Sequence, residues 1–223
     1  MYRYVFFDLD GTLTDSKEGI VKSVRWTLQR MGAPVPGEET LQLFIGPPLQ
    51  DSFERFCGFT PARAAEAVGV FRERYHPIGQ FENQAAPGAA DLLARLRERG
   101  YRLALASSKP EELCLTICRR FDFTPHLAVI TGSPPLEDWS KAQVIRETMA
   151  RLGLTEADRA SILMVGDRKF DVLGARECGV DCLGVEFFGY APPGELQEAG
   201  AVAVVKTVPE LEAFLLNQET SAF

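Results

Sequence analysis

The chain has 223 residues, of which 46% are hydrophobic and 25% are charged, and its formal net charge is −7. This length allows one large domain or a core with an insertion, and the composition excludes a disordered, collagen-like or coiled-coil chain. The acidic balance disfavours nucleic acid and anionic membranes as partners, because both attract a basic protein face.

The first predicted strand covers residues 4–7 and is followed by an acidic segment, residues 8–14. Beyond this segment the apolar residues recur at helical spacing, and no convincing strand is found before residue 87. Helices are predicted there over residues 18–31, 38–45, 49–57 and 61–75. We therefore expect an α-helical domain, residues 15–86, inserted after the first strand.

From residue 87 onward, apolar β-rich runs and helical patterns follow one another along the chain. Further strands are predicted over residues 102–106, 127–130, 161–165, 182–185 and 201–205. Helices are predicted over residues 89–99, 141–152, 172–177 and 210–216. The strand runs are apolar throughout, as in strands buried on both faces. This order predicts an α/β fold with a doubly wound, Rossmann-like parallel sheet, built from residues 1–14 and 87–223.

Two carboxylates follow the first strand. Asp8 and Asp10 are two residues apart, so their side chains leave the chain on the same side. Carboxylates this close repel each other unless a cation lies between them, and Mg²⁺ binds carboxylate and phosphate oxygens together. The alternative is a turn that only ends the strand.

Two serines and a lysine are further candidates. Ser107 and Ser108 lie at the end of the second predicted strand, and hydroxyls before a helix suit an anion at the helix N-terminus. The alternative is that one of them only caps the helix. Lys141 begins a later helix, where a solvated surface lysine is the alternative interpretation.

A second pair of carboxylates follows the strand at residues 161–165. Asp167 ends this strand and Asp171 lies one helical turn further, so both can face the strand end. The alternative is that both only stabilise the N-terminus of the helix. Ligands of doubly wound sheets bind beyond the carboxyl ends of the strands, where the fold would gather these candidates. A metal, a lysine and an attacking carboxylate together suit phosphoryl transfer.

The sequence resembles the haloacid dehalogenase-like hydrolase superfamily. The resemblance rests on four segments in the order of that family, namely residues 8–14, Ser107, Lys141 and residues 166–171. Residues 44–49 and 184–190 are similar to segments of its phosphoglycolate phosphatase and 5′-nucleotidase-like branch. Residues 15–86 resemble the small α-helical cap domain of this family.

The resemblance implies a Mg²⁺-dependent phosphatase that acts on a small phosphorylated metabolite through an aspartyl-phosphate. Asp8 would be the nucleophile, and Asp10 would protonate the leaving alcohol and then activate water. Mg²⁺ would bind Asp8, the backbone carbonyl of Asp10 and Asp167, with Asp171 as a direct or indirect metal partner. The cation would reverse the local field, so the net charge of −7 does not exclude an anionic substrate.

The resemblance also implies phosphate contacts. Ser107 and Lys141 would hold the phosphoryl oxygens with help from Ser108, and Lys141 would also orient Asp8. Lys109 is the alternative lysine for this role. The substrate stays open among phosphoglycolate, a nucleoside monophosphate, a sugar phosphate, pyrophosphate and a modified metabolite, and the protein is expected to be a monomer or homodimer.

Four other functions are compatible with parts of the sequence pattern. A phosphomutase of β-phosphoglucomutase type would use the same core and cap. A dehalogenase is disfavoured because Asp10 supplies an acid and base that phosphate chemistry needs. A signalling receiver is disfavoured because its acceptor aspartate follows a middle strand, and an inactive relative is disfavoured because every matched position is intact.

The location is expected to be a reducing cytoplasm. No run approaches the roughly 18–20 apolar residues of a membrane span, and the first residues do not form a signal peptide. The five cysteines include no CxxC pair, and the two histidines stand apart, so we expect structural thiols rather than a zinc site.

Overall fold

The computed structural model describes residues 1–134 and 139–220. The chain forms two compact units, and each is described by itself. The larger unit comprises Met1–Thr14 and Ala85–Phe223, and the smaller unit comprises Asp15–Gln84. The chain therefore leaves the larger unit directly after residue 14 and returns to it at residue 85.

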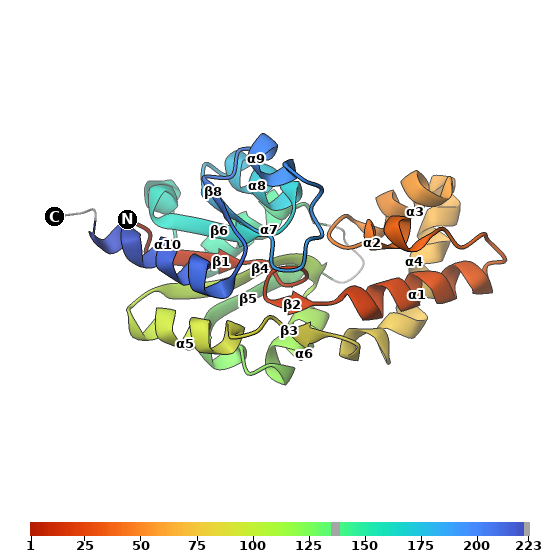
Figure 1. Cartoon of the computed structure of the whole chain (residues 1–223), viewed down its shortest axis with the longest axis horizontal. Coiled ribbons are helices and arrows are strands. Elements are labelled where there is room, and N and C mark those ends of the chain that lie inside the picture. The colour runs from red at the N-terminus through yellow and green to blue at the C-terminus, as the bar shows by residue number, and fades with distance from the viewer. Residues whose placement is uncertain (135–138, 221–223) are drawn as a thin grey trace. The chain divides into compact units, whose positions relative to one another are not determined.

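The larger unit is built on a six-stranded sheet with the order β5-β4-β1-β6-β7-β8 (Figure 1). Its strands are β1 (Tyr4–Phe7), β4 (Arg102–Pro110), β5 (Leu127–Ser133), β6 (Ile162–Gly166), β7 (Asp181–Val185) and β8 (Ala203–Val205). Every neighbouring pair in this sheet is parallel. The predicted α/β fold with a parallel sheet is confirmed.

The order of the strands reverses at β1. The chain runs from β1 to β4 and β5 on one side, and then returns to β6, β7 and β8 on the other. Tyr4 pairs with both Arg102 of β4 and Ile162 of β6, so the three central strands are aligned. A reversal of this kind opens a crevice at the carboxyl ends of the strands, which is where ligands bind in such sheets.

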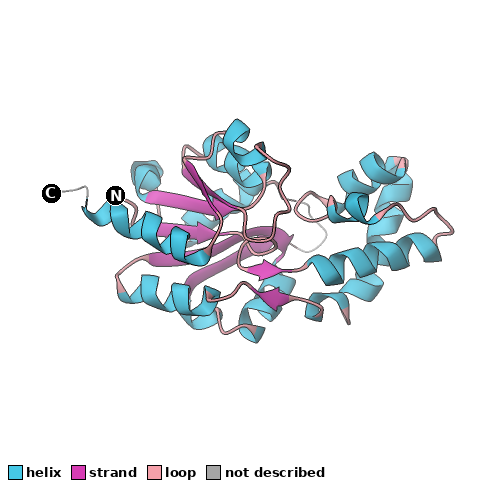
Figure 2. Cartoon of the chain, viewed as in Figure 1, coloured by secondary structure: helices cyan, strands magenta, loops and turns pink. Residues whose placement is uncertain are grey.

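Helices cover both faces of the sheet (Figure 2). The alternation of β1 sends Val5 and Phe7 into one apolar layer and Phe6 into the other. The first layer is closed by α5 (Ala89–Glu98), α6 (Glu111–Arg120) and α10 (Val208–Thr220). The second is closed by α7 (Lys141–Arg151), α8 (Lys169–Glu177) and α9 (Glu195–Ala199). Two short 3₁₀ turns complete this unit, Thr124–His126 and Glu156–Ser161.

The smaller unit is helical. It contains α1 (Lys17–Arg30), α2 (Glu38–Gln42), α3 (Leu49–Cys57), α4 (Pro61–Tyr75) and a 3₁₀ turn, Gly79–Phe81. Gly58 ends α3 with a φ of 65°, a left-handed conformation that favours glycine. Thr60 then accepts a hydrogen bond from the Arg63 N–H, and Pro61 takes the first position of α4. Phe44 and Phe53 pack edge to face in its apolar interior.

Some elements differ from the prediction. The strands β2 (Thr14–Asp15) and β3 (Gln84–Ala85) form a separate two-stranded sheet, although no strand was expected in residues 15–86. Strands of two residues are too short to show a periodic pattern. The helix expected after Ser107 and Ser108 is α6, for which no bounds were predicted, and its buried side chains recur at helical spacing: Leu113, Cys114, Ile117 and Cys118.

Two features relate to the expectation of structural thiols and of no membrane span: the state of the cysteines and the character of the helices. All five cysteines are free thiols, and four of them are buried. Among the described helices, none has the length and apolar character needed to cross a membrane.

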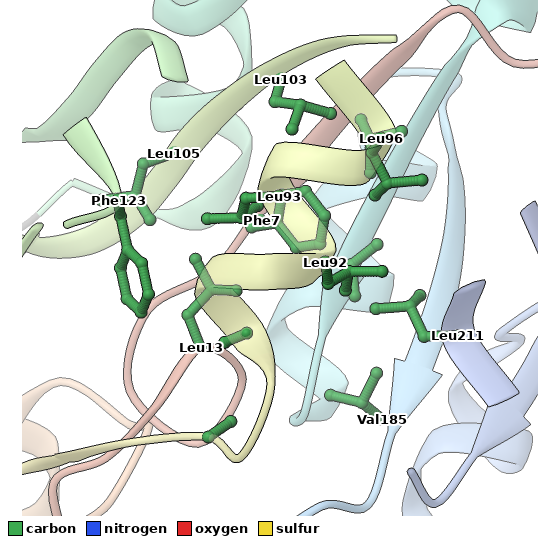
Figure 3. Packing of buried hydrophobic residues seen from close by; sticks show 14 of the residues in the cluster. Phe7, Leu13, Leu92, Leu93, Leu96, Leu103, Leu105, Phe123, Val185 and Leu211 are labelled. Atoms are coloured by element: carbon green, nitrogen blue, oxygen red, sulfur yellow. The ribbon is translucent and has the colours of Figure 1, made fainter. Parts of the chain in front are cut away.

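Leu93 lies at the centre of the first apolar layer, between α5 and the sheet (Figure 3). Its side chain is 0% exposed, so Leu93→Ala should leave a cavity and lower the free energy of unfolding by about 2–5 kcal/mol. Leu173 on α8 is 37% exposed, and the matched change Leu173→Ala should cost less than about 1 kcal/mol. Urea unfolding of both variants checks this, and equal losses would contradict the assigned core.

Candidate active site

Asp8 is held by the sheet itself. It follows the last residue of β1, and its backbone N–H donates to the Val165 carbonyl oxygen at 2.9 Å. This hydrogen bond extends the parallel pairing of β1 and β6 by one residue. The Asp8 side chain is 12% exposed, so its carboxylate is placed by rigid backbone in a nearly buried position.

A tight turn follows Asp8. The backbone N–H groups of Leu13 and Thr14 both donate to the Leu9 carbonyl oxygen at 3.0 Å. Gly11 has a φ of 84°, and a Cβ atom there would lie 2.1 Å from Oδ2 of Asp167. Only glycine therefore allows this turn to pass directly against the Asp167 carboxylate.

Three carboxylates come together beside this turn. Asp8, Asp167 and Asp171 are all buried, and each offers an oxygen within 4.8 Å of the others. Asp167 follows β6, and Asp171 lies in the first turn of α8, where its Oδ2 accepts a hydrogen bond from the Arg168 N–H at 3.1 Å. A Cβ atom on Gly166 would lie 2.2 Å from Cγ of Asp171, so this glycine makes room for the carboxylate. We call these three residues the carboxylate cluster.

Lys141 lies inside the carboxylate cluster. Its Nζ is 2.8 Å from Oδ1 of Asp8 and 2.8 Å from Oδ1 of Asp171, and it donates to the Ala106 carbonyl oxygen at 3.0 Å. Ser140 caps α7, so the helix starts at the lysine. The side chain of Lys141 is 6% exposed, and the alternative of a solvated surface lysine is wrong.

The electrostatics of the cluster are unbalanced. Burial raises the pKa of Asp167 well above its ordinary value, and the charges of Asp171 and Asp8 raise it further. Burial also disfavours the charge of Lys141, but the Asp171 and Asp8 carboxylates outweigh this effect and raise its pKa. One ammonium group thus faces three carboxylates, and the cluster lacks positive charge.

The carboxylate cluster fits a divalent cation. Its donors are hard carboxylate oxygens, the kind that Mg²⁺ prefers. Oδ2 of Asp167 is buried and has no hydrogen-bond partner among the described residues, which is costly unless a cation or water contacts it. Asp10 is not part of the cluster, and its metal contact through the backbone carbonyl stays a prediction.

Asp10 has a lysine of its own. Its Oδ2 is 2.6 Å from Nζ of Lys109, and the two side chains are 15% and 7% exposed. Lys109 was considered only as an alternative phosphate-binding lysine, and no spacing in the sequence indicates this pair. The two aspartates that follow β1 therefore contact different lysines: Asp8 pairs with Lys141, and Asp10 pairs with Lys109.

The two serines lie within β4, which continues to Pro110, rather than after it. Ser107 is 3% exposed, and its Oγ accepts a hydrogen bond from the Lys109 N–H at 3.4 Å. The Ser108 carbonyl oxygen accepts a hydrogen bond from Oγ of Ser133 at 2.8 Å. Pro110 takes the N-cap position of α6, so the alternative that either serine caps this helix is wrong.

Three residues beside the carboxylate cluster are not singled out by the sequence: Thr12, Arg168 and Glu195. Oγ1 of Thr12 donates to Oδ1 of Asp167 at 3.3 Å, and Thr12 is completely buried. Arg168, next to Asp167, forms a buried ion pair with Glu195 of α9. Thr12 and Arg168 lie within the two acidic segments, residues 8–14 and 166–171, from which the site is predicted. No motif in the sequence around Glu195 indicates a role at the site.

Comparisons with known proteins agree with this geometry. A sequence model of the haloacid dehalogenase-like hydrolase family matches residues 5–185. The chain is 42% identical over 198 residues to a 5′-nucleotidase from Pseudomonas aeruginosa, covering 88% of this chain and 87% of the relative. It is 38% identical to a Mycobacterium tuberculosis protein named tyrosine-protein kinase PtkA, covering 95% of this chain and 72% of the relative.

Solved structures and more distant relatives extend the comparison. The structure of a predicted phosphatase from Clostridium acetobutylicum has a TM-score of 0.89 and 37% identity, covering 97% of this chain and 99% of the other. Relatives named pyrophosphatase and phosphoglycolate phosphatase are each 30% identical to this chain.

The raised pKa of Asp167 should make the stability of the metal-free protein depend on pH. The folded state holds the proton of this carboxyl more tightly than the unfolded state, in which its pKa is about 3.9. The contribution of this carboxyl group to stability is therefore complete below that value and is lost as pH rises toward the raised, folded-state pKa. Asp167→Asn should remove this loss and give a higher melting temperature than the wild type at pH 7 in EDTA.

Thermal unfolding in EDTA from about pH 4 to 8 measures this effect. Asp158→Asn is the control, because two hydrogen bonds from Thr155 and the charge of Arg3 lower the pKa of Asp158, whose side chain is partly exposed. The control should not stabilise the protein. A lower melting temperature for Asp167→Asn than for the wild type at pH 7 would contradict the unbalanced cluster.

Proposed function

The chain belongs to the haloacid dehalogenase-like hydrolase family and is a phosphatase, and from this we propose that it hydrolyses small phosphate monoesters by attack of the Asp8 carboxylate. The sequence resemblance to the family and to its phosphoglycolate phosphatase and 5′-nucleotidase-like branch is confirmed. The observation that carries the proposal is the placement of Asp8 in the carboxylate cluster, 2.8 Å from Lys141.

The first half of the reaction forms a bond between a carboxylate oxygen of Asp8 and the phosphorus atom. Lys141 holds that carboxylate in place and stays positively charged, because two carboxylates raise its pKa. Mg²⁺, held by Asp8, Asp167 and Asp171, would supply positive charge against the phosphate oxygens. The bond to the leaving oxygen breaks, and Asp10 donates the proton that the alkoxide takes up.

The second half of the reaction releases phosphate. Asp10, now ionised, accepts a proton from water as the water oxygen attacks phosphorus. The bond between phosphorus and Asp8 breaks, which regenerates the carboxylate and frees inorganic phosphate. Lys109, whose Nζ is 2.6 Å from Oδ2 of Asp10, holds this carboxyl group in place. Ser107, Ser108 and Lys141 are the proposed contacts of the phosphoryl oxygens.

A nucleoside 5′-monophosphate is the proposed substrate class, since the 42%-identical relative is named 5′-nucleotidase. The smaller unit, Asp15–Gln84, is proposed to act as a cap that governs substrate choice. Location in a reducing cytoplasm, with the five free thiols as structural residues, stays a prediction.

Asp8→Asn should lower phosphate release from p-nitrophenyl phosphate by more than about 10³-fold, because an amide is a poor nucleophile. The fold should survive, since the change is isosteric and the backbone N–H of Asp8 still pairs with Val165. Asp91→Asn, on the exposed side of α5, is the matched control and should keep full activity. Retention of a tenth or more of the activity by folded Asp8→Asn would disprove Asp8 as the nucleophile.

A substrate panel tests the proposed reaction and its metal. Nucleoside 5′-monophosphates should give a higher kcat/KM than phosphoglycolate, sugar phosphates or pyrophosphate. EDTA should abolish turnover until Mg²⁺ is restored. Phosphate release and sugar phosphate isomerisation are measured in parallel. Isomerisation faster than release would favour the phosphomutase, and full activity in EDTA would exclude the metal-dependent reaction.

A further inference from the structure

A buried ion pair lies directly beside the carboxylate cluster. Nε of Arg168 donates to Oε1 of Glu195 at 2.9 Å, and Nη2 donates to Oε2 at 3.4 Å. The two side chains are 6% and 9% exposed. Arg168 is the residue between Asp167 and α8, and Glu195 is the first residue of α9.

Glu195 also holds the backbone of α8. Its Oε1 accepts a hydrogen bond from the N–H of Lys169, the first residue of that helix, at 3.0 Å. In the same turn the N–H of Arg168 donates to Oδ2 of Asp171 at 3.1 Å. One glutamate on α9 thus contacts two of the three residues that lie between Asp167 and Asp171 in the chain, Arg168 and Lys169.

The charge of Glu195 matters as well as its geometry. Burial would raise the pKa of Glu195, but hydrogen bonds from Arg168 and from the Lys169 N–H lower it below its ordinary value. Glu195 is therefore ionised at neutral pH and neutralises the guanidinium next to Asp167. Without this charge, the buried guanidinium of Arg168 would lose its ion pair with Glu195, next to the site that must attract Mg²⁺.

A buried ion pair is weak evidence of added stability, because desolvation offsets much of the attraction. Groups that orient metal ligands from behind are, in contrast, a common feature of metal sites. We propose that Glu195 is a positioning residue for the metal site, which acts through Arg168 and the first turn of α8 to set Asp167 and Asp171 for Mg²⁺. The proposal rests on the proposed function, since that function supplies the cation.

Glu195→Gln tests this directly, because glutamine keeps the length and one acceptor oxygen but loses the charge. The dissociation constant of Mg²⁺, measured by calorimetry on the metal-free protein, should rise by about 10-fold or more. At saturating Mg²⁺ the kcat for p-nitrophenyl phosphate should stay within about threefold of the wild type, because Asp8 and Lys141 are untouched. A purely structural role would lower the melting temperature and leave Mg²⁺ affinity unchanged.

Glu212→Gln is the matched control. Glu212 accepts from Nε and Nη2 of Arg95, both at 2.8 Å, which is the same two-bond geometry between α5 and α10. This variant should bind Mg²⁺ like the wild type. Equal weakening in both variants would show a general loss of stability and overturn the proposal.

A double variant keeps the test decisive if Glu195→Gln fails to fold. Arg168→Met together with Glu195→Met replaces the buried pair by apolar side chains, a change that often preserves folding. It removes the acceptor of the Lys169 N–H, so Mg²⁺ affinity should still fall. Mg²⁺ binding within twofold of the wild type in a folded variant would overturn the positioning role. A wild type that neither binds Mg²⁺ nor releases phosphate would instead overturn the proposed function.

Discussion

The repulsion among three buried carboxylates governs the architecture of this site. Asp8, Asp167 and Asp171 are buried, each offers an oxygen within 4.8 Å of the others, and the ammonium group of Lys141 contacts two of them. Such a group costs free energy unless further positive charge arrives. The carboxylates can come this close because the glycines at positions 11 and 166 leave the space that the side chains of Asp167 and Asp171 occupy.

The parallel sheet brings this group together from distant parts of the chain. Asp8 follows β1 and Asp167 follows β6, and the aligned register of these strands places both at the same edge. Lys141 begins α7, which packs on the second face, and Gly174 of α8 leaves room for it, because a Cβ atom there would lie 2.7 Å from Cβ of Lys141. The reversal of strand order at β1 therefore supplies both the crevice and its ligands.

The sequence was sufficient for the strands of the large sheet and for the acidic motifs, because both leave local patterns, whereas the two-residue strands β2 and β3 leave none. Apolar runs of four or more residues mark the strands, and the spacing of Asp167 and Asp171 marks one turn of helix. The pairing of Asp10 with Lys109, and of Arg168 with Glu195, was not predictable in this way. These contacts depend on where distant side chains lie after folding, and no periodic pattern in the sequence records them.

The acidic character of the chain also takes on a physical meaning. A net charge of −7 would oppose a phosphate substrate if its charges were spread evenly. At the proposed cation site, a bound Mg²⁺ and the ammonium group of Lys141 would instead balance the charges of the three clustered carboxylates, so the site need not repel a phosphate. The charge of the whole chain is thus a poor guide to the sign of the field at the site.

The position of the phosphoryl group during turnover tests the central claim most directly. Enzyme mixed with a preferred phosphate ester and Mg²⁺ can be quenched with acid within the first turnover and mapped by peptide mass spectrometry. A phosphoryl group on Asp8, which disappears when EDTA replaces Mg²⁺, is the predicted result. Product release without a phosphoryl group on Asp8, or a phosphoryl group trapped on another residue, would contradict nucleophilic attack from the carboxylate cluster.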